Sequence, residues 1–264
     1  MLYFVKFHGI KYPMESSFTP EPEEHLLCEV KDEVFIGRAG RKLQYDVEPK
    51  GSILRPIYEK EGDKLRRIRG DEETALRYCK KRIKHYNLEM KLIGVDKEWN
   101  DKRYKFHFLA NKRVDFRELV KDLKDKFGCI IELRHIGMRD NAGNTGGIGI
   151  CGRPLCCSTF LVEKPSVSLE EARDQDIYIS PSKISGPCGR LLCCLAYEHE
   201  FYKEVSQNFP ERGDTVVTGK DESTVLYRNM ITRVVTVSYE NETQEEISID
   251  EIERKGDKWI RVKK

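Results

Sequence analysis

The feature that most constrains this chain is a seven-residue cysteine motif that occurs twice. The first copy, CGRPLCC, spans residues 151–157, and the second copy, CGRLLCC, spans residues 188–194, so one constant interval separates corresponding cysteines. The two copies contain six of the nine cysteines in the chain: Cys151, Cys156, Cys157, Cys188, Cys193 and Cys194. Ordinary packing does not require such a repeat. Two equivalent thiol-rich turns therefore indicate a soft-metal centre or a redox-sensitive thiol site.

The expected redox environment decides between metal binding and disulfides. The residues after Met1 lack the basic segment and the continuous apolar stretch of a signal peptide, and no membrane span is indicated. We therefore expect a cytoplasmic protein. Because thiols are kept reduced in the cytoplasm, the clustered cysteines are expected to bind metal rather than to form structural disulfides.

Length and charge limit the number of domains and the classes of function that the chain can have. A chain of 264 residues can bury a substantial core and favours about two domains. Its 47 basic and 45 acidic residues nearly cancel, so nucleic-acid binding cannot be inferred from net charge and would need a local basic patch. No carboxylate pair or nucleophile motif supports hydrolysis, and we expect a protein that is not an enzyme.

The apolar pattern predicts an α+β protein with three parts. These are a small N-terminal β module at 1–60, a central α+β cysteine-rich domain at 71–207, and a C-terminal SH3-like β-barrel at 208–264. Such barrels often bind RNA or protein, but a fold alone does not establish either role.

Two short predictions concern the first half of the chain. The charge-dense stretch 59–70 is expected to be a linker or an exposed turn. A helix is expected from Asp71, which can cap it, with Cys79 buried on the apolar face.

The middle of the chain has the clearest alternation of elements. Strands are predicted at 88–95 and 104–109, and an amphipathic helix capped by Asp115 is predicted to end at Gly128 before a further strand begins at Cys129. This order implies a sheet with helices on one face. Residues 140–149 are predicted to form a loop whose glycines adopt positive φ rather than cradle a phosphate. Helical structure is predicted at 195–207, followed by short strands to the C-terminus.

The geometry of the cysteine motif narrows what each thiol can do. Neighbouring side chains diverge in a helix and alternate in a strand, so Cys156 and Cys157 cannot easily face one centre. A turn is predicted at Cys151 and Gly152, with a helical start at Pro154. Six thiolates exceed one Cys₄ centre, whether it holds zinc or an iron–sulfur cluster. Either two cysteines pack in the core, or a second centre takes ligands from another chain.

Four stretches around the motifs resemble one known family. They read RVDFRELVKDL from Arg113, IELRHIGMRD from Ile131, GGIGICGRPLCC from Gly146 and KISGPCGRLLCCLAYE from Lys183. Together they resemble the bacterial YaaT family, also called RicT, of stage 0 sporulation proteins with a polymerase-suppressor C-terminal domain. The likeness spans roughly residues 79–198, whereas the first 60 residues match the family poorly.

The resemblance implies a non-catalytic regulatory protein with an iron–sulfur cluster, of the 4Fe-4S type. Its expected partners are two small helical proteins of the RicA and RicF type, together with an RNase Y type endoribonuclease that it assists in mRNA processing, and through it in sporulation, competence and biofilm formation. The cluster ligands that the resemblance implies come from Cys151, Cys156, Cys157, Cys188, Cys193 and Cys194.

Two alternatives remain open. The first is a zinc-stabilised nucleic-acid-binding protein, supported by the C-terminal barrel and by the basic segment KLRRIR at 64–69, which we otherwise interpret as a solvated face. The second, a thiol redox enzyme, is weaker because the chain contains no Cys-x-x-Cys motif. His135 and His199 lie nearest to the motifs and are interpreted as ordinary surface or sheet residues rather than ligands.

Overall fold

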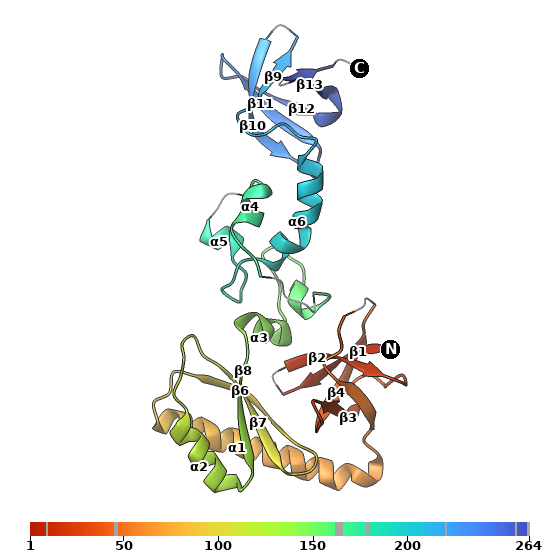
Figure 1. Ribbon diagram of the computed structural model, residues 1–264, viewed down its shortest axis with the longest axis vertical. Coiled ribbons are helices and arrows are strands. Elements are labelled where there is room, and N and C mark those ends of the chain that lie inside the picture. The colour runs from red at the N-terminus through yellow and green to blue at the C-terminus, as the bar shows by residue number, and fades with distance from the viewer. Residues whose placement is uncertain are drawn as a thin grey trace. The chain divides into compact units, whose positions relative to one another are not determined.

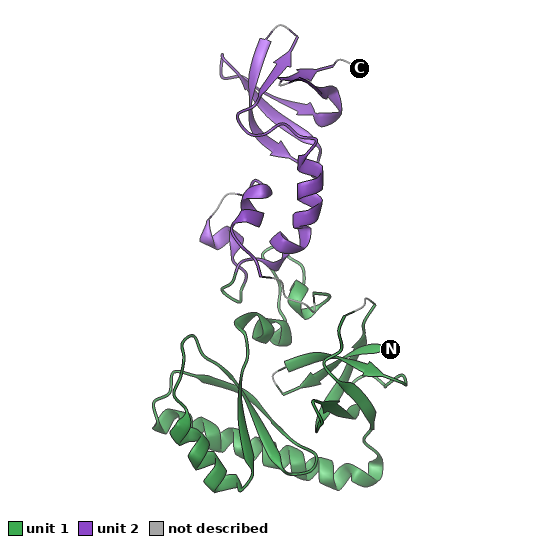
Figure 2. Ribbon diagram, in the orientation of Figure 1, with its two compact units in different colours: residues 1–164, 187–190 green, residues 165–186, 191–264 purple. Residues whose placement is uncertain are grey.

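The computed structural model divides into two compact units (Figure 2). The first contains residues 1–164 and 187–190, and the second contains residues 165–186 and 191–264. The structure describes residues 1–8, 10–44, 47–161, 166–177, 180–219, 221–256 and 258–262. Both units combine helices with strands (Figure 1), which confirms the predicted α+β class.

A closed β-barrel forms the N-terminal part of the first unit, in the order β1-β2-β5-β3-β4. Its strands are β1 (Leu2–Phe7), β2 (Ile10–Ser16), β3 (His25–Val30), β4 (Glu33–Lys42) and β5 (Ser52–Pro56). The barrel closes where β4 pairs antiparallel with β1. A Cβ added at Gly37 on β4 would lie 2.2 Å from Cγ1 of Val5, so glycine permits the close approach there. The predicted N-terminal β structure is confirmed.

The long helix α1 spans Gly62–His85 and follows a short 3₁₀ turn, η1, at Glu59–Glu61. The predicted linker at 59–70 and the predicted helix start at Asp71 are therefore wrong. Lysine, arginine and glutamate are good helix formers, and Ile68 extends the apolar stripe that continues through Ala75 and Cys79. The segment is rich in charged residues because only one face of this helix is buried.

The central sheet has the order β6-β7-β8, formed by β6 (Lys91–Lys97), β7 (Arg103–Leu109) and β8 (Ile130–His135). The β6–β7 pair is antiparallel and the β7–β8 pair is parallel. Helix α2 (Arg117–Phe127) makes the crossover and ends at Gly128, whose φ of 64° confirms the predicted stop. Asp115 accepts a hydrogen bond from the Arg117 backbone at 3.2 Å, although the helix itself starts only at Arg117.

Helices α1 and α2 pack their apolar residues against one face of this sheet, as predicted. The other face of the sheet, which carries the polar residues of β7, is covered by the N-terminal barrel. Lys105 and His107 on β7 are only 7% and 2% exposed, and Lys105 forms a 2.8 Å ion pair with Glu33 of the barrel. The barrel and the central sheet thus share buried surface within the first unit.

The second unit starts with three helices, α4 (Glu170–Asp174), α5 (Pro181–Ile184) and α6 (Cys193–Ser206). A six-stranded sheet follows in the order β12-β11-β10-β9-β14-β13. Its elements are β9 (Thr215–Thr218), β10 (Asp221–Asn229), β11 (Val234–Tyr239), β12 (Gln244–Ser248), η3 (Ile249–Glu251), β13 (Ile252–Lys255) and β14 (Lys258–Arg261). The C-terminal strands are confirmed, but the SH3-like barrel is not, because the strand order of the described residues ends at β12 and β13.

Helix lengths and hydropathy bear on membrane insertion. In the described parts of the chain, no helix is both long and apolar enough to cross a membrane.

Candidate metal centre at the cysteine motifs

A short helix and two glycines lead into the first cysteine motif. Helix α3 spans Met138–Thr145, so the loop predicted at 140–149 is wrong for its first half. A Cβ at Gly143 would lie 2.7 Å from the Cys157 carbonyl oxygen, which shows that the helix packs closely on the motif. Gly146 and Gly147 then have φ of 78° and 138°, so the predicted positive φ holds at these two glycines but not at Gly143 or Gly149.

The two motifs have the same backbone structure. Gly152 and Gly189 occupy equivalent positions and have φ of 77° and 72°, so the predicted turn is confirmed in the first copy and recurs in the second. Leu155 and Leu192 have φ/ψ of −53°/128° and −58°/127° and each precedes a helical turn. The repeated sequence therefore specifies a repeated local structure.

An isolated β-bridge holds each motif in its extended part. Pro154 is bridged to Ile148, and the equivalent Leu191 is bridged to Ser185. The helical start predicted at Pro154 is wrong, because the backbone is extended at this bridge.

Helical structure begins instead at the paired cysteines of each motif. The 3₁₀ turn η2 spans Cys156–Ser158, and α6 starts at Cys193. Adjacent side chains on a helix diverge by about 100°, so the two thiols of each pair point in different directions.

The nine cysteines fall into two chemical groups, and none of them forms a disulfide. Cys28 and Cys79 are completely buried, and burial raises the pKa of each thiol to about 12. Cys129 is half-buried against the apolar core, so the interpretation of Cys79 and Cys129 as packing residues is confirmed. Of the six motif cysteines, Cys151 is exposed and the other five are half-buried. The one exposed thiol therefore belongs to a motif, whereas the two completely buried thiols lie outside the motifs.

The six motif cysteines are divided between the two compact units. Four of them belong to the first unit and two, Cys193 and Cys194, to the second. Within the first unit, no three of the described cysteine sulfur atoms lie within 4.8 Å of one another. The assignment of these cysteines as ligands therefore stays a prediction.

The two histidines nearest to the motifs have ordinary surroundings. Nε2 of the exposed His135 lies 3.1 Å from the Ala110 carbonyl oxygen. Nδ1 of His199 lies 3.8 Å from an Asp174 carboxylate oxygen. His135 is a surface residue, as predicted, whereas His199 is half-buried and its Nδ1 has no hydrogen-bond partner among the described residues.

A cluster of two buried carboxylates and the exposed His8, which no sequence pattern indicated, joins the barrel to the central sheet. In the described chain it contains the single set of three metal-ligating side chains whose ligand atoms lie within 4.8 Å of one another: His8, Glu72 and Asp96. Oδ1 of Asp96 accepts hydrogen bonds from the His8 backbone at 2.9 Å and lies 3.1 Å from its Nδ1, while Oδ2 lies 2.6 Å from His107 Nε2.

An arginine already supplies the cation for this cluster. Nη1 of Arg69 lies 2.9 Å from a Glu72 oxygen and 3.1 Å from His8 Nδ1. Burial raises the pKa of Asp96, but hydrogen bonds from His107 and His8 outweigh burial and hold the net pKa below its usual range. Burial likewise raises the pKa of Glu72, where the nearby charges do not overcome it. The arrangement is that of an internal ionic network, and we assign no metal to it.

No sequence signal pointed to this network. His8 and Asp96 are 88 positions apart, and His107 fits the polar positions of an alternating strand. Such a strand is normally half-exposed, so burial of its polar face could be recognised only after the barrel was placed on the sheet.

Two regions of the chain match known protein families. Residues 51–136 match the PSP1 C-terminal conserved region, and residues 166–209 match the third domain of PSP1-like proteins. Stage 0 sporulation protein YaaT of Bacillus subtilis (strain 168) is 43% identical to this chain over 168 residues. These matches relate the chain to the YaaT family.

The extent of these matches differs between relatives. The aligned stretch covers 64% of this chain, and the chain spans 61% of the length of the B. subtilis relative. An uncharacterized protein of Schizosaccharomyces pombe is 37% identical over 71 residues, which cover 27% of this chain and 10% of that protein. No solved structure matches the chain.

The two matched regions map onto both units. The first region runs from β5 to the end of β8 and includes α1, α2 and the central sheet. The second includes α4, α5, the second cysteine motif and α6. The first cysteine motif lies between the two regions.

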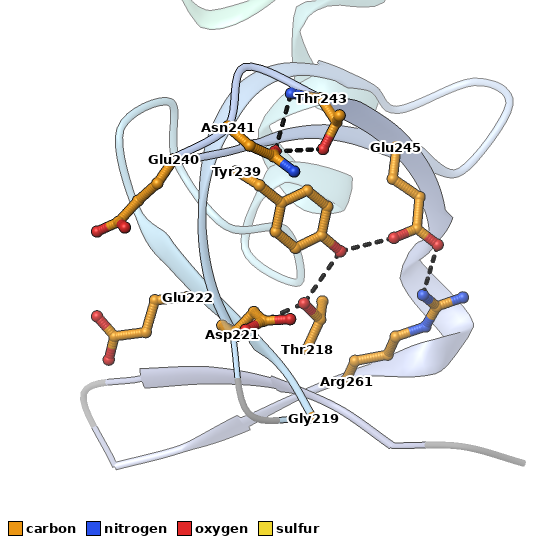
Figure 3. A pocket seen from close by; sticks show the side chains of 10 residues that line it. All are labelled: Thr218, Gly219, Asp221, Glu222, Tyr239, Glu240, Asn241, Thr243, Glu245 and Arg261. Carbon is orange, nitrogen blue, oxygen red and sulfur yellow. Dashed lines mark hydrogen bonds and ion pairs between the residues drawn. The ribbon is translucent and has the colours of Figure 1, made fainter.

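A cavity of about 1080 Å³ in the C-terminal sheet contains no motif residue (Figure 3). The Tyr239 hydroxyl accepts a hydrogen bond from Thr218 at 3.0 Å and donates one to Glu245 at 2.6 Å. Glu245 in turn forms a 2.7 Å ion pair with Arg261. These polar groups satisfy one another and tie β9, β11, β12 and β14 together, which is a structural role.

Proposed function

We propose that this chain is a non-catalytic iron–sulfur regulatory adaptor. With partner proteins it assists an RNase Y type endoribonuclease in mRNA processing, and thereby acts in developmental regulation. The name of the B. subtilis relative, a stage 0 sporulation protein, supports the developmental role. The partners are two small helical proteins of the RicA and RicF type.

The observation that carries the proposal is the duplicated motif with accessible thiols. Both copies place one cysteine before a positive-φ glycine and two at a helical start. The remaining cysteines are buried or packed against the core, so the accessible thiols are concentrated in the motifs.

The donor set fits an iron–sulfur cluster. All candidate donors are thiols, which are the usual ligands of a [4Fe-4S] cluster. When bound, such a cluster supplies a one-electron redox centre whose potential depends on solvent exposure and on hydrogen bonds to its sulfur atoms. The ligands are drawn from Cys151, Cys156, Cys157, Cys188, Cys193 and Cys194. One centre leaves two thiolates for packing or for a cluster shared with a partner chain.

Zinc is the second candidate, and the spacing within each motif supports it. Four residues separate Cys151 from Cys156 and also Cys188 from Cys193. This Cys-x₄-Cys spacing lies within the range found in zinc hooks, so spacing alone does not separate the two metals. A zinc protein with nucleic-acid-binding activity is the corresponding function.

The test is anaerobic purification, followed by a visible spectrum and analysis of iron, acid-labile sulfide and zinc. We expect brown protein that contains iron and sulfide. Cys151→Ser and Cys188→Ser should each lower cluster loading while thermal melting stays close to wild type, because the described core does not include these thiols. Cys129→Ser is the matched control and should keep its cluster.

The same variants test the regulatory role in cells. RNase Y dependent mRNA processing should fail with Cys151→Ser and persist with Cys129→Ser. Colourless protein with stoichiometric zinc would replace the iron–sulfur proposal with the zinc alternative. Normal processing with cluster-free Cys151→Ser protein would refute a regulatory role for the cluster.

A further inference from the structure

A basic recess of about 540 Å³ opens in the first unit between the barrel and α1. Its lining residues come from β1 and the turn after it, from β3 and β4, and from the first half of α1: Lys6, Phe7, His8, His25, Arg38, Leu65, Arg66 and Arg69. Among these described residues, every permanently charged side chain is a cation. The recess therefore has the composition of an anion site.

Buried carboxylates pair with two of the lining residues, Glu72 with Arg69 and Asp96 with His8, but the carboxylates that pair with Arg38 and Arg66 neutralise them only weakly. Arg38 contacts Glu23 at 3.4 Å and Arg66 contacts Asp63 at 2.5 Å, but the two carboxylate side chains are 70% and 95% exposed. Exposed ion pairs contribute little, so a bound anion can compete for both arginines. Lys6 forms no salt bridge with any residue that the structure describes.

A histidine in the recess responds to this positive environment. Burial lowers the pKa of His25, and the charges of Arg69 and Arg38 lower it further. Glu23 opposes these effects without reversing them. The cations of α1 and of the barrel therefore act on the same space.

The helix phase explains which residues of the segment 64–69 face the recess. Arg66 and Arg69 are three positions apart and share a face of α1, whereas Arg67 pairs with Asp101 at 2.7 Å and Lys64 lies over the Trp99 ring. Arg66 and Arg69 therefore face the recess, whereas Lys64 and Arg67 contact residues that follow β6.

We propose that the basic recess binds the phosphate group of a nucleotide, either free or within an RNA strand. Arginine presents a planar fork of donors that matches phosphate oxygens. The volume lies in the range of small-molecule sites, roughly 300–1,000 Å³. Phosphate binding here uses none of the cysteines and is independent of metal loading.

The experiment titrates fluorescein-labelled decauridylate with full-length protein and follows fluorescence anisotropy at 50 and 200 mM salt. The test variant carries Lys6→Gln, Arg38→Gln and Arg66→Gln, and leaves Arg69 in its buried network. The control removes three exposed lysines of α1 outside the recess: Lys80→Gln, Lys81→Gln and Lys84→Gln. Both variants change the net charge equally.

Single-stranded binding falls with a log–log salt slope of about −0.7 per phosphate contact, so three contacts give about a 20-fold loss of affinity between 50 and 200 mM salt. We expect the recess variant to lose this salt-dependent part of the affinity and to bind the probe at least tenfold more weakly at 50 mM salt. The control variant should lose much less affinity. Equal loss in both variants, or no loss in either, would overturn the proposal.

Competitors distinguish the sources of the phosphate. If unlabelled decauridylate competes and uridine monophosphate does not, the recess binds RNA. If the mononucleotide competes equally well, the recess binds a free nucleotide. A polyglutamate peptide that competes as well as either would refute phosphate recognition. Because Cys151→Ser should bind the probe normally, failure here is distinguishable from failure of the cluster proposal.

Discussion

Replacing Asp96 with asparagine should destabilise the first unit far more than replacing an exposed aspartate. Asp96 is 4% exposed and contacts the backbone and ring of His8 and the buried ring of His107. Asparagine keeps one acceptor oxygen but directs an amide group at the other histidine contact. Removal of one partner from a buried, hydrogen-bonded charge pair costs about 3–5 kcal/mol.

Urea unfolding can measure this cost in one unit. The chain has two tryptophans, Trp99 in the first unit and Trp259 in the second, so a Trp259→Phe background leaves Trp99 fluorescence as the reporter. With an m-value of about 2 kcal/mol/M, the midpoint should fall by roughly 1.5–2.5 M. The control, Asp63→Asn, removes a carboxylate that is 95% exposed and should shift it little.

The pH dependence gives the same experiment a second readout. Because the folded-state pKa of Asp96 is depressed, its stabilisation is present above the ordinary value of 3.8 and is lost as pH falls through the folded value. The gap between wild type and Asp96→Asn should therefore narrow under strongly acidic conditions. A midpoint shift no larger than that of Asp63→Asn would refute the stabilising role of the buried network.

Two further predictions concern His8 and the cysteines. Burial lowers the pKa of His8, but contact with Asp96 outweighs burial and raises the net pKa above 6.5. The stability that protonated His8 contributes is therefore present below pH 6.5 and is lost as pH rises, so the stability reported by Trp99 should fall above pH 6.5 in wild type and fall less in His8→Gln. Iodoacetamide at pH 8 should modify Cys151 first in native metal-free protein and leave Cys28 and Cys79 unmodified, because those thiols are buried with pKa values of about 12. Peptide mass spectrometry measures the modification, and labelling of Cys28 as fast as Cys151 would contradict the assigned burial.

The sequence alone determined the features that depend on neighbouring residues. The positive-φ glycine in each motif, the helix stop at Gly128 and the burial of Cys79 all follow from local sterics or from the period of one helix. The duplicated motif belongs to the same class, because nearly identical sequences at Gly152 and Gly189 adopt nearly identical backbone conformations.

Only the tertiary structure decided which faces are buried and which distant side chains meet. The period of β7 was read correctly, but Lys105 and His107 became buried because the N-terminal barrel covers the sheet. The charged start of α1 resembles a linker in sequence because it contains few apolar residues. It is held as a helix because Ile68 packs into a small apolar core. The pairing of His8 with Asp96 and the convergence of barrel and helix cations on one recess depend on contacts between elements far apart in the chain, which no local period encodes.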